Sequence, residues 1–273
     1  MYAKMALRNA DAQFHQISDH WLNAHAITEV YSISINRTLS RVHPIYRLLN
    51  NHLKYTIAIN ALARKGLINP GGYVHQLCSI GDKMVEFLAD NYAKLDFRTL
   101  DFPSRIGSQG FSSTYKGALE EFPYVDDGAL VWDAMNEYVG EYLSLYYGSD
   151  DDVSSDNEID DWIKEIKENG HPNHRSQFNG MKTVTDLQKF LTTIIWTASC
   201  YHSVVNFSQY KMYGFVPNYP LALYQPIAQS KDIINEEFIM KSLPQLKHAS
   251  IQIMLLNSLS VFSGNEEFLI SER

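Results

Sequence analysis

Apolar residues recur every three or four positions over several long stretches of this sequence, and this pattern is the strongest constraint on its fold. The clearest stretch covers residues 13–36, with apolar positions at Ile17, Trp21, Ala24, Ile27, Tyr31 and Ile35. Such spacing places apolar side chains on one face of an α-helix. The same spacing predicts a second run after Pro44 through Leu62 and further helices over residues 129–147, 183–210, 236–243 and 249–262, with weaker signals over 84–94 and 115–119. Glycine and proline, which often interrupt helices, occupy about 8% of positions against roughly 12% on average, so we expect a mainly α fold.

Charge and cysteine content exclude several classes of protein. Lys and Arg number 23 and Asp and Glu number 31, a net charge of −8, whereas a protein that binds a phosphate backbone needs surplus cations. We therefore expect no nucleic-acid partner. Cys78 and Cys200 form no Cys-x-x-Cys pair, which argues against a disulfide framework or a zinc ribbon and indicates a reducing compartment. Neither a transmembrane segment nor a signal peptide is expected, and the expected location is cytoplasmic.

Two polar segments carry simple structural predictions. Residues 150–161 contain seven acidic residues and lack the central Gly and terminal Glu of an EF-hand, so we interpret them as a solvated loop and helix start rather than a Ca²⁺ site. Ser155-x-x-Glu158 has the form of a capping box for a helix through about residue 168. In the polar stretch that follows, His171 and His174 are expected at the surface, because no Cys or carboxylate pairing suggests a metal.

The histidines point to chemistry. His15, His20 and His25 follow one another at intervals of five on one predicted helix, and in an ideal α-helix that interval rotates a side chain by about 140°. A π-bulge would bring His20 and His25 together. Far downstream, His202 and Asn206 share one face of another predicted helix, on its apolar stripe.

Two hypotheses follow from this spacing. In the first, the two helices supply three imidazoles and one amide to a buried iron, zinc, copper or nickel ion, and the neutral amide oxygen favours a redox-active ion over a closed structural zinc site. In the second, His15 and His25 are interfacial or exposed, while His202 and Asn206 are hydrogen-bonded core residues or mark a helix kink.

Several segments carry a resemblance to a known family. His15-Gln16-x3-His20-Trp21-Leu22-Asn23-Ala24-His25 resembles the iron-binding helix of the lipoxygenases, His-Gln-x3-His-x4-His. Further similar blocks follow in order over residues 43–49, 59–69, 124–132, 145–153 and 197–210. The resemblance covers nearly the whole chain, and its blocks from 124 to 153 are especially similar to plant-type members.

The resemblance implies roles for individual residues. It assigns three imidazole ligands of a non-haem iron and a weaker fourth ligand, at His20, His25, His202 and Asn206, and it makes His15 a neighbouring non-ligand. Gln16 and Gln209 fall where the family orients its ligands through hydrogen bonds. Leu67 matches the leucine that packs against the reacting pentadiene, and Ala63 matches the stereocontrol position, where Ala is associated with S hydroperoxides.

The implied activity is a non-haem iron dioxygenase of polyunsaturated fatty acids. In the family, ferric hydroxide removes hydrogen from the bis-allylic methylene of a 1,4-pentadiene, and O₂ adds to the opposite face of the radical to give a hydroperoxide. The implied partners are the fatty acid and O₂, with peripheral membrane contact in the full-length family. No other organic cofactor is implied.

The sequence also departs from the family pattern. Lipoxygenases end in an Ile whose carboxylate is an iron ligand, whereas this sequence ends in Arg273, and Tyr219 stands near a position where some plant members have Arg. Residues 1–273 are therefore expected to form a partial catalytic domain without the N-terminal β-sandwich and the C-terminal tail. This leads us to expect apolar surface of residues 129–147 and 187–205 to face water. The alternative function is a truncated, inactive helical module that binds lipid or a partner.

Overall fold

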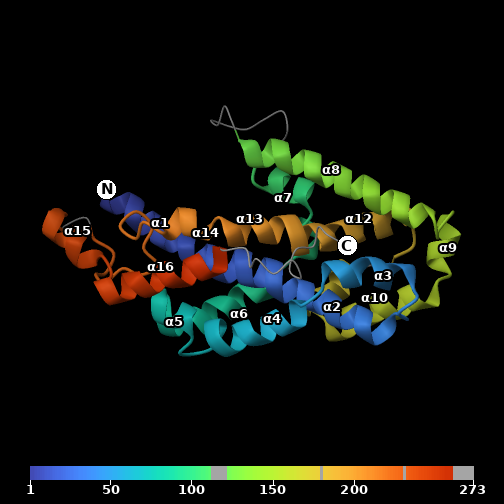
Figure 1. Ribbon diagram of the computed structural model, residues 1–273, viewed down its shortest axis with the longest axis horizontal. Helices are drawn as coiled ribbons and strands as arrows, with labels where there is room; N and C mark the ends of the chain where they lie inside the picture. Colours follow the sequence, from blue (N-terminus) through green and yellow to red (C-terminus); the bar gives the residue numbers. More distant parts are fainter. Residues whose placement is uncertain (112–121, 179–180, 230–231, 261–273) are drawn as a thin grey trace. The chain divides into compact units, whose positions relative to one another are not determined.

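The protein is described here by a computed structural model that covers residues 1–111, 122–178, 181–229 and 232–260 (Figure 1). Over these residues the secondary structure consists of helices, without strands, which confirms the predicted mainly α class. None of the described helices is both long enough and apolar enough to cross a membrane. The prediction for residues 115–119 lies outside the described residues. By internal contacts the chain divides into two compact units, each built from segments distant in sequence.

The first unit contains residues 1–22, 58–92 and 202–273. Its elements, of which η1, α4 and α6 run on into the second unit, are α1 (Tyr2–Phe14), η1 (His15–Ala26), α4 (Thr56–Ala63), η2 (Arg64–Ile68), α5 (Tyr73–Leu77), η3 (Gly81–Lys83), α6 (Met84–Lys94), α13 (His202–Phe207), α14 (Gln209–Tyr213), α15 (Glu236–Ser242) and α16 (Leu246–Ser260). Helix α16 packs against α5, α13 and α14. The long helix α16 therefore covers the short helices α13 and α14.

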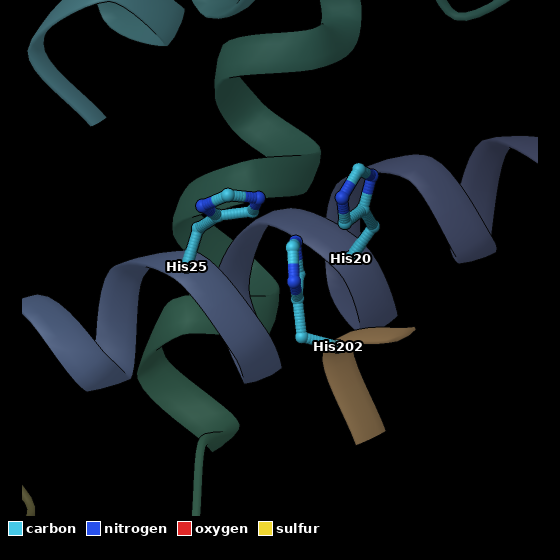
Figure 2. Close-up of side chains that lie close together, drawn as sticks. All are labelled: His20, His25 and His202. Atoms are coloured by element: carbon cyan, nitrogen blue, oxygen red, sulfur yellow. The ribbon is translucent and has the colours of Figure 1, made fainter. Parts of the chain in front are cut away.

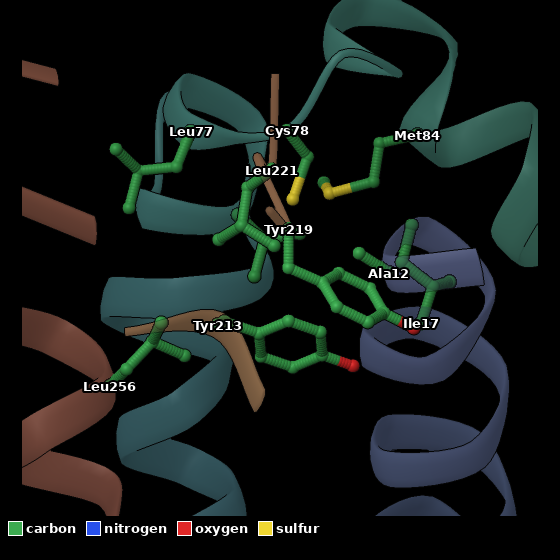
Figure 3. Close-up of a cluster of buried hydrophobic side chains, with 10 residues drawn as sticks. Ala12, Ile17, Leu77, Cys78, Met84, Tyr213, Tyr219, Leu221 and Leu256 are labelled. Carbon is green, nitrogen blue, oxygen red and sulfur yellow. The ribbon is translucent and has the colours of Figure 1, made fainter. Parts of the chain in front are cut away.

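An apolar cluster forms the core of this unit (Figure 3). Its buried members are Ala12, Ile17, Val74, Leu77, Cys78, Met84, Tyr213, Tyr219, Leu221 and Leu256. The fully buried side chain of Gln252 supplies the polar partners that the irregular backbone beside the cluster needs. Its amide donates to the carbonyls of Tyr213 (3.0 Å) and Tyr219 (3.2 Å), and its oxygen accepts from the Leu221 N–H (3.1 Å). Buried backbone groups are costly when unpaired, so Gln252 stabilises this non-helical segment.

The second unit contains residues 23–57 and 93–201. Its elements are α2 (Ile27–Thr38), α3 (Pro44–His52), η4 (Phe97–Thr99), α7 (Phe102–Ser108), α8 (Pro123–Ser144), α9 (Asp150–Ser154), α10 (Asn157–Asn169), α11 (His174–Gln177), α12 (Val184–Trp196) and η5 (Thr197–Tyr201). Helix α8 packs on α12, and α10 packs on α2. Two glycines allow α8 to approach its neighbours closely: an added Cβ would lie 2.5 Å from the Phe102 ring at Gly128 and 2.7 Å from the Gln188 amide at Gly140.

Several predicted helix boundaries differ from the structure. The run after Pro44 is split into α3 and α4, and Tyr55 between them has a positive φ of 69°. Helix α8 begins at Pro123 rather than near residue 129, since proline at the first helical position lacks only an N–H that would have no partner there. The predicted capping box at Ser155 is wrong: Ser149 and Asp152 form one for α9, and Asp156 caps α10. In contrast, the Thr183 side chain does cap α12 by accepting from the Asp186 N–H.

The expected exposure of apolar surface is confirmed for residues 129–147 and, within residues 187–205, for Val204, which is 44% exposed, but not for α12. On α8, Leu130 is 71% exposed, whereas Trp132, Val139 and Leu143 are buried. Helix α12 is different: it is buried on nearly every side, including its predicted stripe at Leu187, Leu191, Ile194 and Ile195. Within the second unit, α12 packs against α3, α8, α9 and η5.

The surface location predicted for His171 and His174 is wrong, since both are buried. The backbone N–H of Asn173 donates to His171 Nδ1 (3.1 Å), and the His174 ring packs edge-on against Phe178 with centroids 5.1 Å apart. Polar side chains can be buried when local backbone groups satisfy them, and Phe178, four residues after His174, supplies an aromatic partner at helical spacing.

Candidate metal centre

The chain between His15 and Ala26 forms a π-helix, η1, of 12 residues. In a π-helix the backbone hydrogen bonds join residues five apart, so side chains at that interval lie nearly above one another. His20 and His25 have this interval. The predicted π geometry is confirmed, and it extends over several turns instead of a single bulge.

Three imidazoles lie close together (Figure 2). His20 and His25 rise from η1, and His202 is the first residue of α13, directly after the π-helical segment η5. One nitrogen from each ring lies within 4.8 Å of the others, and the rings of His20 and His202 have centroids 5.5 Å apart. His20 is buried, whereas His25 and His202 are partly exposed.

This donor set fits a transition-metal ion. Neutral imidazole is a ligand that zinc, copper, iron and nickel share. Three such rings with their nitrogens directed toward one point can occupy one coordination sphere and leave further positions for other ligands. Of the hypotheses raised by the histidine spacing, the structure therefore supports a group that could bind a metal ion.

A chain of buried amides adjoins the three rings. The Gln16 amide donates to Gln209 Oε1 (2.6 Å), and the Gln209 amide donates to Asn206 Oδ1 (3.3 Å). The same Gln209 nitrogen lies 3.5 Å from Nδ1 of His20. Asn206 in turn donates to the Leu259 carbonyl (2.9 Å). The structure thus brings Gln16, Gln209 and Asn206 into one hydrogen-bonded series that ends at a ring of the cluster.

Asn206 lies one helical turn after His202 on α13, so the two side chains share a face. Its side chain is buried, with the amide nitrogen and the oxygen both hydrogen-bonded. An amide oxygen has two lone pairs, so acceptance of one hydrogen bond leaves the second for another partner.

His15 is also close to the cluster but is directed elsewhere. Its Nε2 lies 2.9 Å from the Val205 carbonyl, and its Nδ1 is hydrogen-bonded to the Tyr213 hydroxyl. Burial lowers the pKa of His15 and outweighs the effect of Asp19, which raises it. The net effect favours the neutral ring. Burial also raises the pKa of the Tyr213 phenol well above its usual value. The sequence analysis did not predict a role for Tyr213. The one feature that could have suggested a role is its position seven residues after Asn206, shortly beyond the helix that carries His202 and Asn206.

A small apolar pocket lies in the first unit beside the amide chain. Gln16 and Gln209 contribute its polar lining, and the remaining lining residues are Tyr73, Val74, Leu77, Cys78, Leu221, Leu255, Leu256 and Leu259. Burial raises the pKa of the Cys78 thiol to about 12, so this residue behaves as an apolar neighbour rather than a nucleophile. These lining residues were not predicted individually, although Val74, Leu77 and Cys78 have helical spacing.

The two predicted substrate-channel residues lie on neighbouring elements. Ala63 is the last residue of α4 and is buried, and Leu67 lies on the π-helix η2 that follows. Leu67 packs against the apolar cluster of Figure 3. Val74, Leu77, Cys78, Leu221 and Leu256 belong to both the cluster and the pocket lining, so Leu67 adjoins the group of residues that forms the pocket.

The fold and site together define a helical protein with a candidate three-imidazole metal centre at a π-helix. Comparison with known proteins gives the family. The sequence model of the family described as Lipoxygenase matches residues 1–273. The chain is 35% identical to Lipoxygenase 2, chloroplastic, of Arabidopsis thaliana, over 98% of this chain and 32% of that protein. It is 33% identical to Linoleate 9S-lipoxygenase 1 of Oryza sativa subsp. japonica, over 98% of this chain and 33% of that protein.

Solved structures agree with the sequence matches. The anaerobic crystal structure of a lipoxygenase with an engineered 413–417 deletion, in complex with arachidonate, superposes with a TM-score of 0.92. That comparison has 34% identity and covers 98% of this chain and 40% of the other. The chain belongs to the lipoxygenase family. It spans about a third of the length of the curated relatives it matches.

Proposed function

We propose that residues 1–273 are part of a lipoxygenase catalytic domain and carry the metal centre for the addition of O₂ to a polyunsaturated fatty acid with a 1,4-pentadiene. The observation that carries this proposal is the convergence of His20, His25 and His202. These three rings, with Asn206 as a weaker fourth ligand, would hold a non-haem iron. When bound, iron supplies the one-electron oxidant that removal of a bis-allylic hydrogen requires.

The amide chain would orient the ligands. Gln209 donates to the oxygen of Asn206, so rotation of Asn206 would break a buried hydrogen bond, and its amide nitrogen lies 3.5 Å from Nδ1 of His20, where it limits rotation of that ring. Gln16 holds the oxygen of the Gln209 amide and thereby determines which end of that amide faces the ligands. Hydrogen bonds of this kind restrict ligand rotation and tune affinity for the metal.

The lining of the apolar pocket would form part of the wall of the substrate channel. Its lining of aliphatic side chains excludes water from a reactive carbon radical, and its polar edge at Gln16 and Gln209 belongs to the amide chain of the metal centre. The names of two relatives refer to linoleate and arachidonate, which both contain a 1,4-pentadiene. We therefore assign fatty acids of this class as substrate, with Leu67 beside the pentadiene and Ala63 favouring S products.

Replacement of His202 by Ala tests the proposal. The purified chain is loaded anaerobically with Fe²⁺, desalted and measured for iron, and conjugated-diene formation is followed with linoleate and with arachidonate. We expect stoichiometric iron in the wild type and an affinity loss in His202→Ala larger than the roughly 10–100-fold typical of changes outside the ligand set. The matched control is His75→Ala, since His75 pairs with Asp82 at the surface of the first unit.

Two results would contradict the proposal. Equal iron retention in His202→Ala and the wild type would show that the three-imidazole cluster is not the metal centre. Fatty-acid binding without iron, unchanged by His202→Ala, would favour the alternative of a helical lipid-binding module.

A further inference from the structure

Both nitrogens of His15 are engaged by groups outside the three-imidazole cluster. A carbonyl oxygen only accepts hydrogen bonds, so the Nε2 atom that lies 2.9 Å from the Val205 carbonyl carries the proton. The neutral ring then has its lone pair on Nδ1, where the Tyr213 hydroxyl donates. The two contacts together require one tautomer and one ring orientation.

The acceptor of His15 lies in the helix that carries two of the candidate ligands. Val205 directly precedes Asn206 and follows His202 by three residues on α13. That helix ends at Phe207, so the Val205 carbonyl belongs to the last turn, where carbonyl groups run out of intrahelical donors. The His15 N–H therefore ties the first residue of the π-helix to the turn that presents Asn206.

The donor to His15 is held rigidly. Tyr213 is fully buried in the apolar cluster of Figure 3, and its ring meets that of Tyr219 edge-on with centroids 4.6 Å apart. Its backbone carbonyl accepts from Gln252. A hydroxyl in such surroundings is costly unless it is hydrogen-bonded, and His15 supplies the acceptor.

His15 also neighbours a candidate ligand directly. Its ring lies 6.5 Å from the ring of His20, with an angle of 28° between their planes. Rotation of His15 would therefore disturb the space that His20 occupies as well as the Val205 contact.

We propose that His15 is a positioning residue for the metal centre, and that the Tyr213 hydroxyl sets its orientation. The pair holds α13 and the ring of His20 in the arrangement that lets the three imidazoles meet. This inference rests on the proposed function, because it concerns the same metal centre. It assigns a role to two residues that do not bind the metal themselves.

Four variants of the full chain test this proposal, with Co²⁺ as the probe. Tyr213→Phe removes only the hydroxyl, and His15→Leu removes both hydrogen bonds. His15→Gln is the conservative variant, because its amide can donate to Val205 and accept from Tyr213. Tyr219→Phe is the matched control: it makes the same chemical change in the adjoining ring, whose hydroxyl donates to Asp11 instead.

The measurements are Co²⁺ affinity, by competition with a chelator, and the visible ligand-field bands of the bound ion. Thermal unfolding of the metal-free variants is recorded alongside. We expect Tyr213→Phe and His15→Leu to weaken Co²⁺ binding by roughly 10–100-fold and to shift the bands. We expect His15→Gln to restore most of the affinity and Tyr219→Phe to bind as the wild type does, even where its unfolding temperature falls.

The possible outcomes separate the two proposals. Wild-type affinity and bands in Tyr213→Phe would overturn the positioning role alone, as would an equal loss in Tyr219→Phe, because the effect would then be one of packing. If Tyr213→Phe fails to fold, the Co²⁺ affinities of His15→Leu and His15→Gln are compared instead. Equal affinities of these two variants would overturn the positioning role of His15. Failure of the wild type to bind Co²⁺ would instead refute the metal centre, and this inference with it.

Discussion

The amide chain beside the metal centre makes a quantitative prediction about Gln209. Its side chain is fully buried, accepts from Gln16 at 2.6 Å and donates to Asn206 at 3.3 Å. Leucine at this position has a similar size but makes neither bond. The substitution leaves one buried donor, on Gln16, and one buried acceptor, on Asn206, without these partners.

The magnitude follows from the cost of an unsatisfied buried group. Each such group costs about 1–3 kcal/mol, so Gln209→Leu should lower the free energy of unfolding by roughly 2–6 kcal/mol. In a chain of this size, 1 kcal/mol corresponds to roughly 2–4 °C in unfolding temperature. We therefore expect the unfolding temperature of the chain to fall by about 4–24 °C.

The assay is thermal unfolding of the chain in the presence of a chelator, followed by circular dichroism, so that the loss of metal binding does not contribute. Gln245→Leu is the matched control, because Gln245 is exposed at the start of α16. The reasoning would be refuted if the unfolding temperatures of Gln209→Leu and the control differed by less than about 2 °C. A difference of about 2 °C is roughly the smallest that 1 kcal/mol would produce. A smaller difference would mean that Gln16 and Asn206 find other partners at no cost.

Two further predictions concern the second unit. Burial, followed by the nearby His171, lowers the pKa of His174 to about 4. The unfolded ring takes up a proton near pH 6.5, so the folded state keeps its full stability above that pH and loses about 3 kcal/mol as the pH falls toward 4. In His174→Phe, the free energy of unfolding measured in urea should depend less on pH over this range. An unchanged pH dependence would contradict the assignment. At Gly128, alanine would place a Cβ 2.5 Å from the Phe102 ring, so we expect a loss of roughly 1–3 kcal/mol that Phe102→Leu partly relieves. Urea unfolding of the single and double variants measures this coupling, and additive effects would count against direct contact.

Much of the local structure could be predicted from periodicity and from residues with strong backbone preferences. The helices around Ile27, Leu48 and Leu191 follow from apolar spacing, and the Thr183 cap follows from a hydroxyl three residues before an acidic side chain. The run after Pro44 could not be subdivided in this way, because Tyr55 with its positive φ carries no signal of that conformation in its residue type.

The candidate site was predictable to a different degree. The interval of five between His20 and His25 excludes convergence in a regular α-helix, so their spacing alone predicts an irregular helix if both bind one ion. The intervals could not decide whether His202 joins them, since its distance along the chain exceeds any local pattern. The family resemblance supplied that assignment, and the proximity of the His202 ring to those of His20 and His25 agrees with it.

The sequence by itself determined most of the longer helices, where the π geometry is needed, and which residue types are available to bind a metal. Those are local properties, set by backbone sterics and by side-chain spacing within one element. Only the tertiary structure decided that α12 is buried, that His171 and His174 are buried, and that Tyr213 orients its hydroxyl toward His15. Each of these depends on which distant segment packs against a given face, and burial and hydrogen bonding are energies of that pairing rather than of either segment alone.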